Sequence, residues 1–204
     1  QVTLSSIEGQ TAVLEINEKI HHISLKLDGA YNIYNAASAV ALVSTIIGES
    51  LDTEKLFTSL SNITPAFGRG EILHINNHPC ELVLVKNPSG FRLGLSSFRP
   101  DNYATMIAIN DNYADGRDMS WLWDVDFDSL QEEGVSVVSG IRAFDMALRL
   151  QYEEVVIKTV EPDLKKGLHI LLSINQPKRI YCTYTAMLAI RKELSKHTNV
   201  EDVR

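Results

Sequence analysis

Apolar and polar residues alternate over the first 30 positions, and the spacing then lengthens to that of a helix. The alternation predicts two strands joined by a turn at Asn17-Glu18-Lys19. An Ala-rich stretch follows and predicts a helix that ends at Gly48, while Asp52 predicts the cap of a second helix that Pro65 closes. The four elements expected in this region are Thr11–Ile16, 20–27, 31–47 and Thr53–Ser61.

Beyond residue 65, short apolar runs alternate with helical stretches. This order is typical of β-α-β units, so it predicts an α/β fold with a Rossmann-like, mostly parallel sheet and helices on both faces. The expected strands are 81–85, 105–109, Val135–Ser139, 154–157 and 168–174, and the expected helices are 89–98, 141–152, 162–166 and 178–196. A boundary at 65–70 therefore separates residues 1–65 from residues 66–204. Two strands and two helices are few for an independent core, so residues 1–65 are expected to be the end of a larger domain.

Composition and charge narrow the function classes. The chain has 204 residues, a formal charge of −7 and 45% hydrophobic residues, which excludes a disordered chain. The acidic balance argues against nucleic acid or an anionic membrane surface as the main partner. Cys80 and Cys182 are too few for a cysteine-based zinc site and are expected in the core of a cytoplasmic protein. The longest apolar run, 36–47, is expected to be too short to cross a bilayer.

The segment 110–128 is the most informative stretch of the chain. It follows the predicted strand 105–109 and so leaves the carboxyl edge of the sheet, where ligands bind in open α/β folds. It holds six aspartates and two tryptophans: Asp111, Asp115, Asp118, Trp121, Trp123, Asp124, Asp126 and Asp128. Each acid alone is well explained as a solvated turn residue, whereas two large aromatics in a polar loop usually pack on something. A calcium loop is excluded, because Ser129 stands where the turn needs Gly and Val135 where a bidentate Glu is needed.

Five other positions are candidates for ligand contacts. Lys86 ends a buried strand, and Asn87 begins the helix that follows, where an anion could bind. Asn32 and Asn35 lie three residues apart on one predicted helix and could read a base edge or cap the helix. Arg69 lies between two glycines, which suit both a phosphate contact and an ordinary turn. The chain has no P-loop and no dinucleotide fingerprint, and its six histidines show no metal-ligand spacing.

Taken in order, these segments resemble the MurT family of Mur-ligase-type subunits. The residues that carry the resemblance are Gly29-x-Tyr-Asn-x-Tyr-Asn-x-Ala, Phe67-Gly-Arg-x-Glu71, Lys86-Asn-Pro-x-Gly90 and Asn110-Asp-Asn-x-Ala-Asp-Gly-Arg-Asp-x-Ser-Trp121. The resemblance implies a C-terminal Rossmann-like domain that follows the end of a Mur ligase central domain. It also implies ATP with Mg²⁺ as cofactor, bound mostly by a P-loop region that these residues do not include. The zinc ribbon of the family is likewise not in this sequence.

The resemblance further implies an activity and a partner. MurT with the glutaminase GatD forms lipid II isoglutaminyl synthase, which amidates the α-carboxyl of D-glutamate in the stem peptide with ammonia taken from glutamine. Asp118 matches the acid that completes the Cys-His site of the partner, so it is the implied catalytic residue. Asn32 and Asn35 match the adenine side of the nucleotide site, and Arg69 matches a position that meets the nucleotide in related ligases. Lys86 and Asn87 are expected as further cofactor contacts. The membrane enters this scheme only through the lipid II substrate.

Lys86 departs from the wider Mur and folylpolyglutamate ligases, in which His usually precedes Asn-Pro. This departure favours ammonia over an incoming amino acid as the acceptor. Two alternatives stay open. The chain could belong to an ATP-dependent amino-acid ligase that works without a glutaminase, or it could be a docking module without catalysis.

Overall fold

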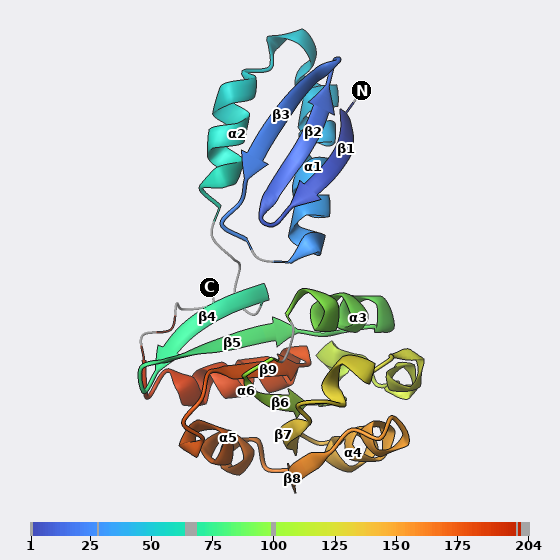
Figure 1. Cartoon of the computed structure of the whole chain (residues 1–204), viewed down its shortest axis with the longest axis vertical. Coiled ribbons are helices and arrows are strands. Elements are labelled where there is room, and N and C mark those ends of the chain that lie inside the picture. The colour runs from blue at the N-terminus through green and yellow to red at the C-terminus, as the bar shows by residue number, and fades with distance from the viewer. Residues whose placement is uncertain (1, 28, 64–68, 99–100, 199, 201–204) are drawn as a thin grey trace. The chain divides into compact units, whose positions relative to one another are not determined.

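The computed structural model describes residues 2–27, 29–63, 69–98, 101–198 and 200, except for the side chains of Glu49 and Arg69. The chain divides into two compact units, Gln1–Pro65 and Ala66–Arg204, which are described separately (Figure 1).

The first unit is a three-stranded antiparallel sheet packed against two helices. Its strands are β1 (Val2–Glu8), β2 (Thr11–Ile16) and β3 (Lys19–Ser24), and its helices are α1 (Ala30–Ile47) and α2 (Thr53–Ser61). Asn17 and Glu18 have φ values of 48° and 64°, which is the conformation that a two-residue hairpin turn requires, so the predicted turn is confirmed. Asp52 caps α2 by accepting from the Lys55 N–H at 3.0 Å, also as predicted. Strand β1 was not predicted.

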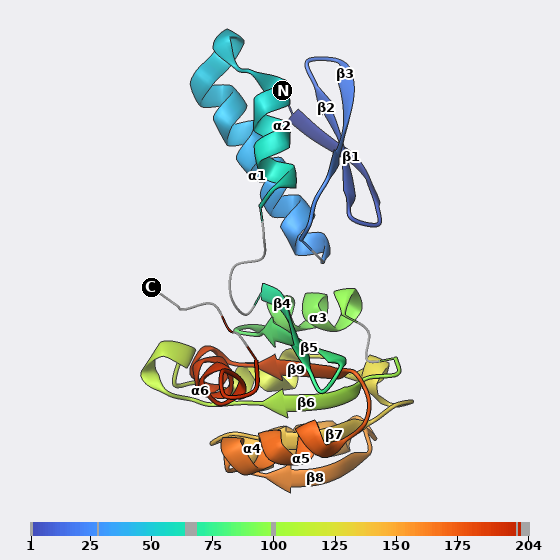
Figure 2. The same cartoon turned by 90° about the vertical axis from the view of Figure 1, so that its left-hand side faces the viewer.

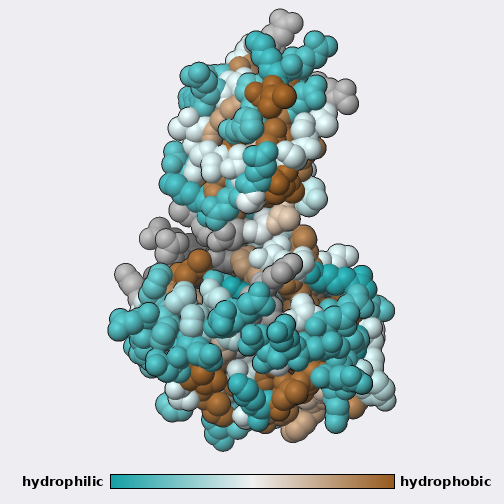
Figure 3. All heavy atoms as spheres, in the orientation of Figure 1, coloured by the Kyte–Doolittle hydropathy of each residue, from teal (hydrophilic) through white to brown (hydrophobic). Residues whose placement is uncertain are grey.

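Helix α1 corrects one expectation from the sequence. With 18 residues it is long and apolar enough to cross a membrane by length and composition, whereas the run 36–47 alone is too short. Such a helix is weak evidence for a membrane span, and here Ile33, Ala36 and Val40 are buried in the core that α1 shares with the sheet. Figure 3 shows hydrophobic side chains at the surface of both units.

The second unit is a six-stranded sheet in the order β4-β5-β9-β6-β7-β8. Its strands are β4 (Arg69–Ile75), β5 (His78–Leu84), β6 (Ala104–Ala108), β7 (Val135–Ser139), β8 (Ile157–Glu161) and β9 (Lys178–Cys182). Only the β4–β5 pair is antiparallel. Helices α3 (Pro88–Ser97) and α4 (Ala143–Tyr152) cover one face, and α5 (Leu164–Ser173) and α6 (Tyr184–Leu194) cover the other (Figures 1 and 2). The predicted α/β, Rossmann-like, mostly parallel sheet with helices on both faces is confirmed.

The element predictions for the last third of the chain were partly wrong. The apolar run 168–174 was expected to be a strand, but it belongs to α5, because Asp163 caps a helix at the Lys166 N–H and Leu168 and Leu171 lie one turn apart in the core. The run 178–196 was expected to be one helix, but it begins with β9. Its first residues, Lys178 and Arg179, are charged, so the sequence pattern did not indicate a buried strand there.

The charge of Arg179 in β9 is paired inside the protein. Arg179 forms an ion pair with Glu81 at 2.6 Å, and its guanidinium lies 3.9 Å from the centre of the Tyr103 ring. The Tyr103 hydroxyl also donates to Glu81 at 2.9 Å. Glu81 neutralises the buried charge and pairs with Nε and Nη2 of Arg179, whereas Nη1 has no hydrogen-bond partner among the described residues.

Both cysteines are buried in the core, as predicted. Cys80 on β5 and Cys182 on β9 are free thiols on the sheet face that α5 and α6 cover. Burial raises the pKa of the Cys80 thiol to about 12 and raises that of Cys182 as well, so neither is a nucleophile at neutral pH.

Candidate functional site at the carboxyl edge of the sheet

The carboxyl ends of β5, β9 and β6 are neighbours, because β9 lies between the other two strands. The segments that leave these strand ends carry Lys86 and Asn87 after β5, residues 110–128 after β6, and Thr183 after β9. Lys86, Asn87 and the Asp-rich segment therefore leave the same edge of the sheet, where open α/β folds bind their ligands.

Asn110 ties three strand ends together. Its N–H donates to the Thr183 Oγ1 at 2.9 Å, and its Nδ2 donates to the Thr185 Oγ1 at 3.0 Å. Its Oδ1 accepts from the Ile141 N–H after β7 at 3.0 Å. The start of the segment is thus fixed to the ends of both neighbouring strands.

Asp115 is the buried acid of the segment, with 4% of its surface exposed. Its carboxylate accepts the Thr185 N–H at 2.7 Å, the Thr185 hydroxyl at 2.6 Å and the Asn112 N–H at 3.0 Å. The two donors of Thr185 hold the segment against the start of α6, and the Asn112 N–H caps the turn at Tyr113–Asp115 within the segment. Asp115 is therefore an anchor, and no pattern in the chain distinguishes it beforehand from the other five aspartates.

Asp118 lies three residues further on and is exposed. Its Oδ1 accepts the Ser120 N–H at 2.8 Å, at the start of the short 3-10 helix η3 (Ser120–Asp124). Hydrogen bonds from the backbone and the side chain of Ser120 lower the pKa of Asp118, so the carboxylate is ionised at neutral pH. The result is an oriented negative charge at the surface.

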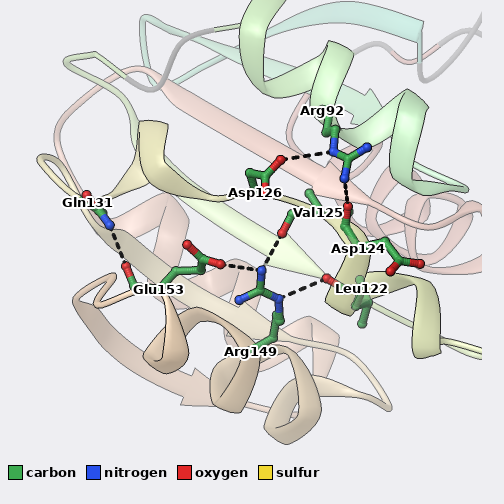
Figure 4. A network of polar contacts seen from close by, with 8 residues as sticks. All are labelled: Arg92, Leu122, Asp124, Val125, Asp126, Gln131, Arg149 and Glu153. Carbon is green, nitrogen blue, oxygen red and sulfur yellow. Dashed lines mark hydrogen bonds and ion pairs between the residues drawn. The ribbon is translucent and has the colours of Figure 1, made fainter.

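Arg149 of α4 holds η3 from below (Figure 4). This buried guanidinium donates to the Leu122 carbonyl at 3.2 Å and to the Val125 carbonyl at 2.6 Å, and it pairs with Glu153. It also lies 5.5 Å from the centre of the Trp123 ring. Sequence reasoning missed Arg149, since a single arginine in a helix has no pattern that marks it as buried.

Arg92 of α3 holds the other side of the same segment. It donates to the Asp124 carbonyl and forms an ion pair with Asp126 at 3.3 Å (Figure 4). The segment after Asp118 is therefore fixed by arginines from two helices.

The two tryptophans have different environments. Trp121 is half-buried, and its ring lies edge-on to Phe91 of α3, 6.4 Å between centres. Trp123 is 49% exposed and packs edge-on against Tyr152 at 5.3 Å. Both rings do pack, as expected, but they pack within the unit and Trp123 keeps half of its surface free.

Two of the predicted nucleotide contacts in the second unit, Lys86 and Asn87, are exposed. Lys86 follows β5, and Asn87 caps α3 with its Oδ1, which accepts the Gly90 N–H at 2.7 Å. The Asn87 oxygen is therefore already engaged, and Lys86 is the candidate that remains available to an anion.

The remaining predicted contacts are not brought together by the described structure. Asn32 is buried in α1 and Asn35 is exposed, so the two amides differ in environment although they lie one turn apart. Both belong to the first unit, which is described apart from the unit that holds Asp118. Arg69 begins β4, and its side chain lies outside the described residues.

Metal ligands do not cluster in the described stretches of the chain. Among those residues, no group of three or more His, Cys, Asp or Glu side chains could hold a metal ion. At this edge Asp118 is ionised, accepts hydrogen bonds from the backbone and the side chain of Ser120, and is exposed.

Comparison with known protein families gives a match over half of the chain. The family described as MurT ligase C-terminal matches residues 84–187, which include β6, the Asp-rich segment, β7, α4 and β9.

Curated relatives match a longer stretch. The chain is 32% identical over 188 residues to the lipid II isoglutaminyl synthase (glutamine-hydrolyzing) subunit MurT of Streptococcus pneumoniae, covering 84% of this chain and 39% of that protein. It is 31% identical over 159 residues to the subunit of the same name from Staphylococcus aureus, covering 76% of this chain and 35% of that protein. The chain thus spans less than two fifths of the length of these relatives.

Solved structures support the fold. A crystal structure of MurF from Acinetobacter baumannii superposes with a TM-score of 0.73 at 18% identity, covering 96% of this chain and 45% of that one. At this identity the likeness shows the fold alone.

Proposed function

The chain belongs to the MurT ligase C-terminal family, and we propose that it supplies Asp118 to the active site of a glutamine-hydrolysing partner. The enzyme so formed would be lipid II isoglutaminyl synthase, the activity for which the curated relatives are named. The partner is a GatD-type glutaminase, and the complex works in the cytoplasm.

The observation that carries this proposal is the contrast between Asp115 and Asp118. Asp115 is buried and uses its carboxylate to anchor the segment. Asp118 is exposed, has a lowered pKa and receives a hydrogen bond only from its near neighbour Ser120. A carboxylate held in this way, on a segment fixed by two arginines, is suited to meet a side chain of another protein.

The chemical role follows from the pairing of carboxylate and imidazole. A cysteine nucleophile in the partner attacks the side-chain amide of glutamine, and a histidine takes the thiol proton and passes it to the leaving ammonia. A carboxylate that accepts the other imidazole N–H fixes the tautomer and stabilises the imidazolium. Asp118 would be that acceptor, supplied across a subunit contact.

The ammonia would then be used in the ligase half of the enzyme. ATP bound with Mg²⁺ would supply the phosphoryl group that activates the α-carboxyl of D-glutamate in the lipid II stem peptide, leaving ADP. Ammonia would then displace phosphate to give D-isoglutamine. Lys86 is the residue of this edge that would contact an anionic group, with Asn87 holding the start of α3 beside it. Asn32, Asn35 and Arg69 are proposed as further nucleotide contacts.

The test is Asp118→Asn in the complex with the glutaminase partner. The amide keeps an oxygen for the Ser120 N–H but cannot stabilise an imidazolium, so kcat for glutamine hydrolysis should fall by up to about 10⁴-fold. The matched control is Asp128→Asn, which alters an exposed acid of the same segment and should leave kcat unchanged.

A measurement of partner binding shows whether a loss of glutamine hydrolysis comes from the catalytic step or from a failure to form the complex. Asp118→Asn should form the complex with unchanged affinity, because the side chain keeps its size. Hydrolysis at the wild-type rate in a complex that contains Asp118→Asn would refute the proposed role.

A further inference from the structure

Large apolar side chains are exposed in an uneven way on the second unit. Eight of them are exposed among its described residues, and six of the eight lie between residues 123 and 156. They are Trp123, Ile141, Phe144, Leu148, Tyr152 and Val156. Scattered single residues need no explanation, but a cluster of this size marks an interaction surface.

Helix α4 presents the centre of this cluster. Ala143, Met146, Arg149 and Leu150 point into the unit and are buried. Phe144, Leu148 and Tyr152 follow one another at intervals of four residues, so they form a stripe on the outer face of the helix. We call these three residues and Trp123 the α4 patch; Figure 3 shows hydrophobic atoms at the end of the second unit where α4 and β8 lie.

A groove continues the patch toward β8. It has a volume of about 460 Å³ and is lined by Phe144, Leu148, Val155 and Val160 among others. The patch is therefore apolar with a hollow beside it, which is the shape that receives an apolar or aromatic side chain of a partner.

The patch is rigidly joined to the segment that carries Asp118. Tyr152 packs against Trp123 of η3. Arg149, on the buried side of α4, donates to the carbonyls of Leu122 and Val125 (Figure 4). Asp118 in turn accepts from the first N–H of η3. Asp118 and the α4 patch are therefore held on the same rigid block.

The charge around the patch restricts what can bind there. Residues 111–156 contain eleven Asp and Glu, three Arg and no Lys, a formal charge of −8, whereas the whole chain carries −7. The excess negative charge of the chain is thus concentrated in the stretch that builds the patch and its surroundings. A binding partner needs an apolar centre and a basic rim.

We propose that the α4 patch is the surface on which the glutamine-hydrolysing partner docks, through an apolar face with a basic rim. This inference rests on the proposed function, because it takes the partner that meets Asp118 as the occupant. Asp118 supplies the catalytic carboxylate and the α4 patch supplies the binding free energy. A second copy of the chain at the same face would bring two stretches of formal charge −8 together, and an anionic membrane would be repelled in the same way.

The test measures binding of the purified glutaminase subunit of the same organism to the full chain, by calorimetry or interferometry. Phe144→Ser and Tyr152→Ser should each weaken the affinity at least about tenfold, because truncated aromatic hot spots have effects of this size or larger. The control is Ile72→Ser on β4, which removes an exposed large apolar side chain that lies outside the patch. It should bind like the wild type.

Further readouts distinguish docking from folding and from other occupants. The patch variants should keep the melting temperature, because their side chains are exposed, and at saturating partner they should regain the wild-type kcat for glutamine hydrolysis. The association rate should fall as salt rises.

Three outcomes would overturn the inference. Equal affinity of all variants, with Asp118→Asn still inactive, would reject the α4 patch and leave the proposed function standing. No binding by the wild-type chain would reject both. A dimer of the chain alone, or binding of the chain to phosphatidylglycerol vesicles, that the patch variants abolish would assign the patch to a different occupant.

Discussion

Replacing Asp115 by Asn tests whether the buried acid anchors the candidate site. The Thr185 hydroxyl accepts from the side-chain amides of Asn110 and Asn112 and donates its only proton to Asp115 Oδ2. Asp115 Oδ2 also accepts a hydrogen bond from the Asn112 N–H. An asparagine oriented to keep the bond from the Thr185 N–H would place its own NH₂ group against these two donors.

The magnitude follows from the donors left without an acceptor. An unpaired buried donor costs about 1–3 kcal/mol, and the Asn112 N–H is only partly buried, so we expect a loss of about 2–3 kcal/mol. With an m-value of about 2 kcal/mol per molar urea, the midpoint of unfolding should fall by about 1–1.5 M. Both tryptophans of the chain, Trp121 and Trp123, lie in the second unit, so their fluorescence reports the unfolding of that unit alone.

A nearby acid provides the control. Asp111 forms a partly exposed ion pair with Arg142 at 3.8 Å, and such pairs contribute about 0–1 kcal/mol. Asp111→Asn should therefore shift the urea midpoint by less than half as much. If Asp115→Asn unfolds at the same urea concentration as the wild type, the reasoning that assigns Asp115 to anchoring is wrong.

Three further changes have outcomes that the structure determines. Arg149→Met should destabilise the second unit by about 3–5 kcal/mol in urea unfolding, because it leaves a carboxylate and two carbonyls without their donor; a loss below about 1 kcal/mol would contradict this. Gly140→Ala should destabilise the unit more than Gly116→Ala, since both glycines have positive φ, 94° and 88°, but only at Gly140 would the added methyl lie 2.4 Å from a carbonyl oxygen; equal effects would refute the steric account. Ser120→Ala should raise the pKa of Asp118 toward its usual value without reaching it, because one of the two hydrogen bonds that lower it remains; an NMR titration of the carboxyl carbon measures the shift, and no shift would exclude a contribution of the Ser120 side chain.

The sign of the pH dependence at Asp118 follows from its lowered pKa. A carboxylate with a pKa below the unfolded value contributes stability above that value, near 3.9, and loses it as the pH falls through the folded pKa. If glutamine hydrolysis is lost on acidification while the pH is still above 5, the titration of another group must therefore cause the loss.

The alternation of strands and helices predicted the fold class because each element has its own hydrophobic period. The prediction of elements failed where charged or polar residues are buried. Arg179, the second residue of β9, is buried with its charge neutralised by Glu81, 98 residues away. The hairpin β4–β5 was missed although Asn76 and Asn77, with φ values of 52° and 64°, form a turn of the kind that Asn favours.

The sequence predicted only part of the candidate site, and there is a physical reason why some residues could be predicted and others could not. The Asp-rich segment could be located because strand 105–109 precedes it, and Asp118 was singled out by the resemblance to a family. Asp115 could not be separated from the other acids, since its partner Thr185 lies 70 residues away and the contact exists only in the folded chain. The α4 patch has the spacing of an ordinary core-facing stripe, and only the exposed fractions reveal that it faces outward.

In the sequence Asp115-Gly-Arg-Asp118, a buried carboxylate and an exposed carboxylate lie within four positions. Gly116 has a φ of 88°, a conformation that residues with a side chain rarely adopt, and nothing lies within 4 Å of the position its Cβ would take. The backbone conformation at this position therefore explains why glycine stands there, and the turn carries the chain from the buried carboxylate to the exposed one. Because Asp115 has its donors within the unit, the conformation of Asp118 does not depend on a partner being present. A carboxylate already oriented before association loses little conformational entropy on binding, which is what supplying a catalytic acid across a subunit contact requires.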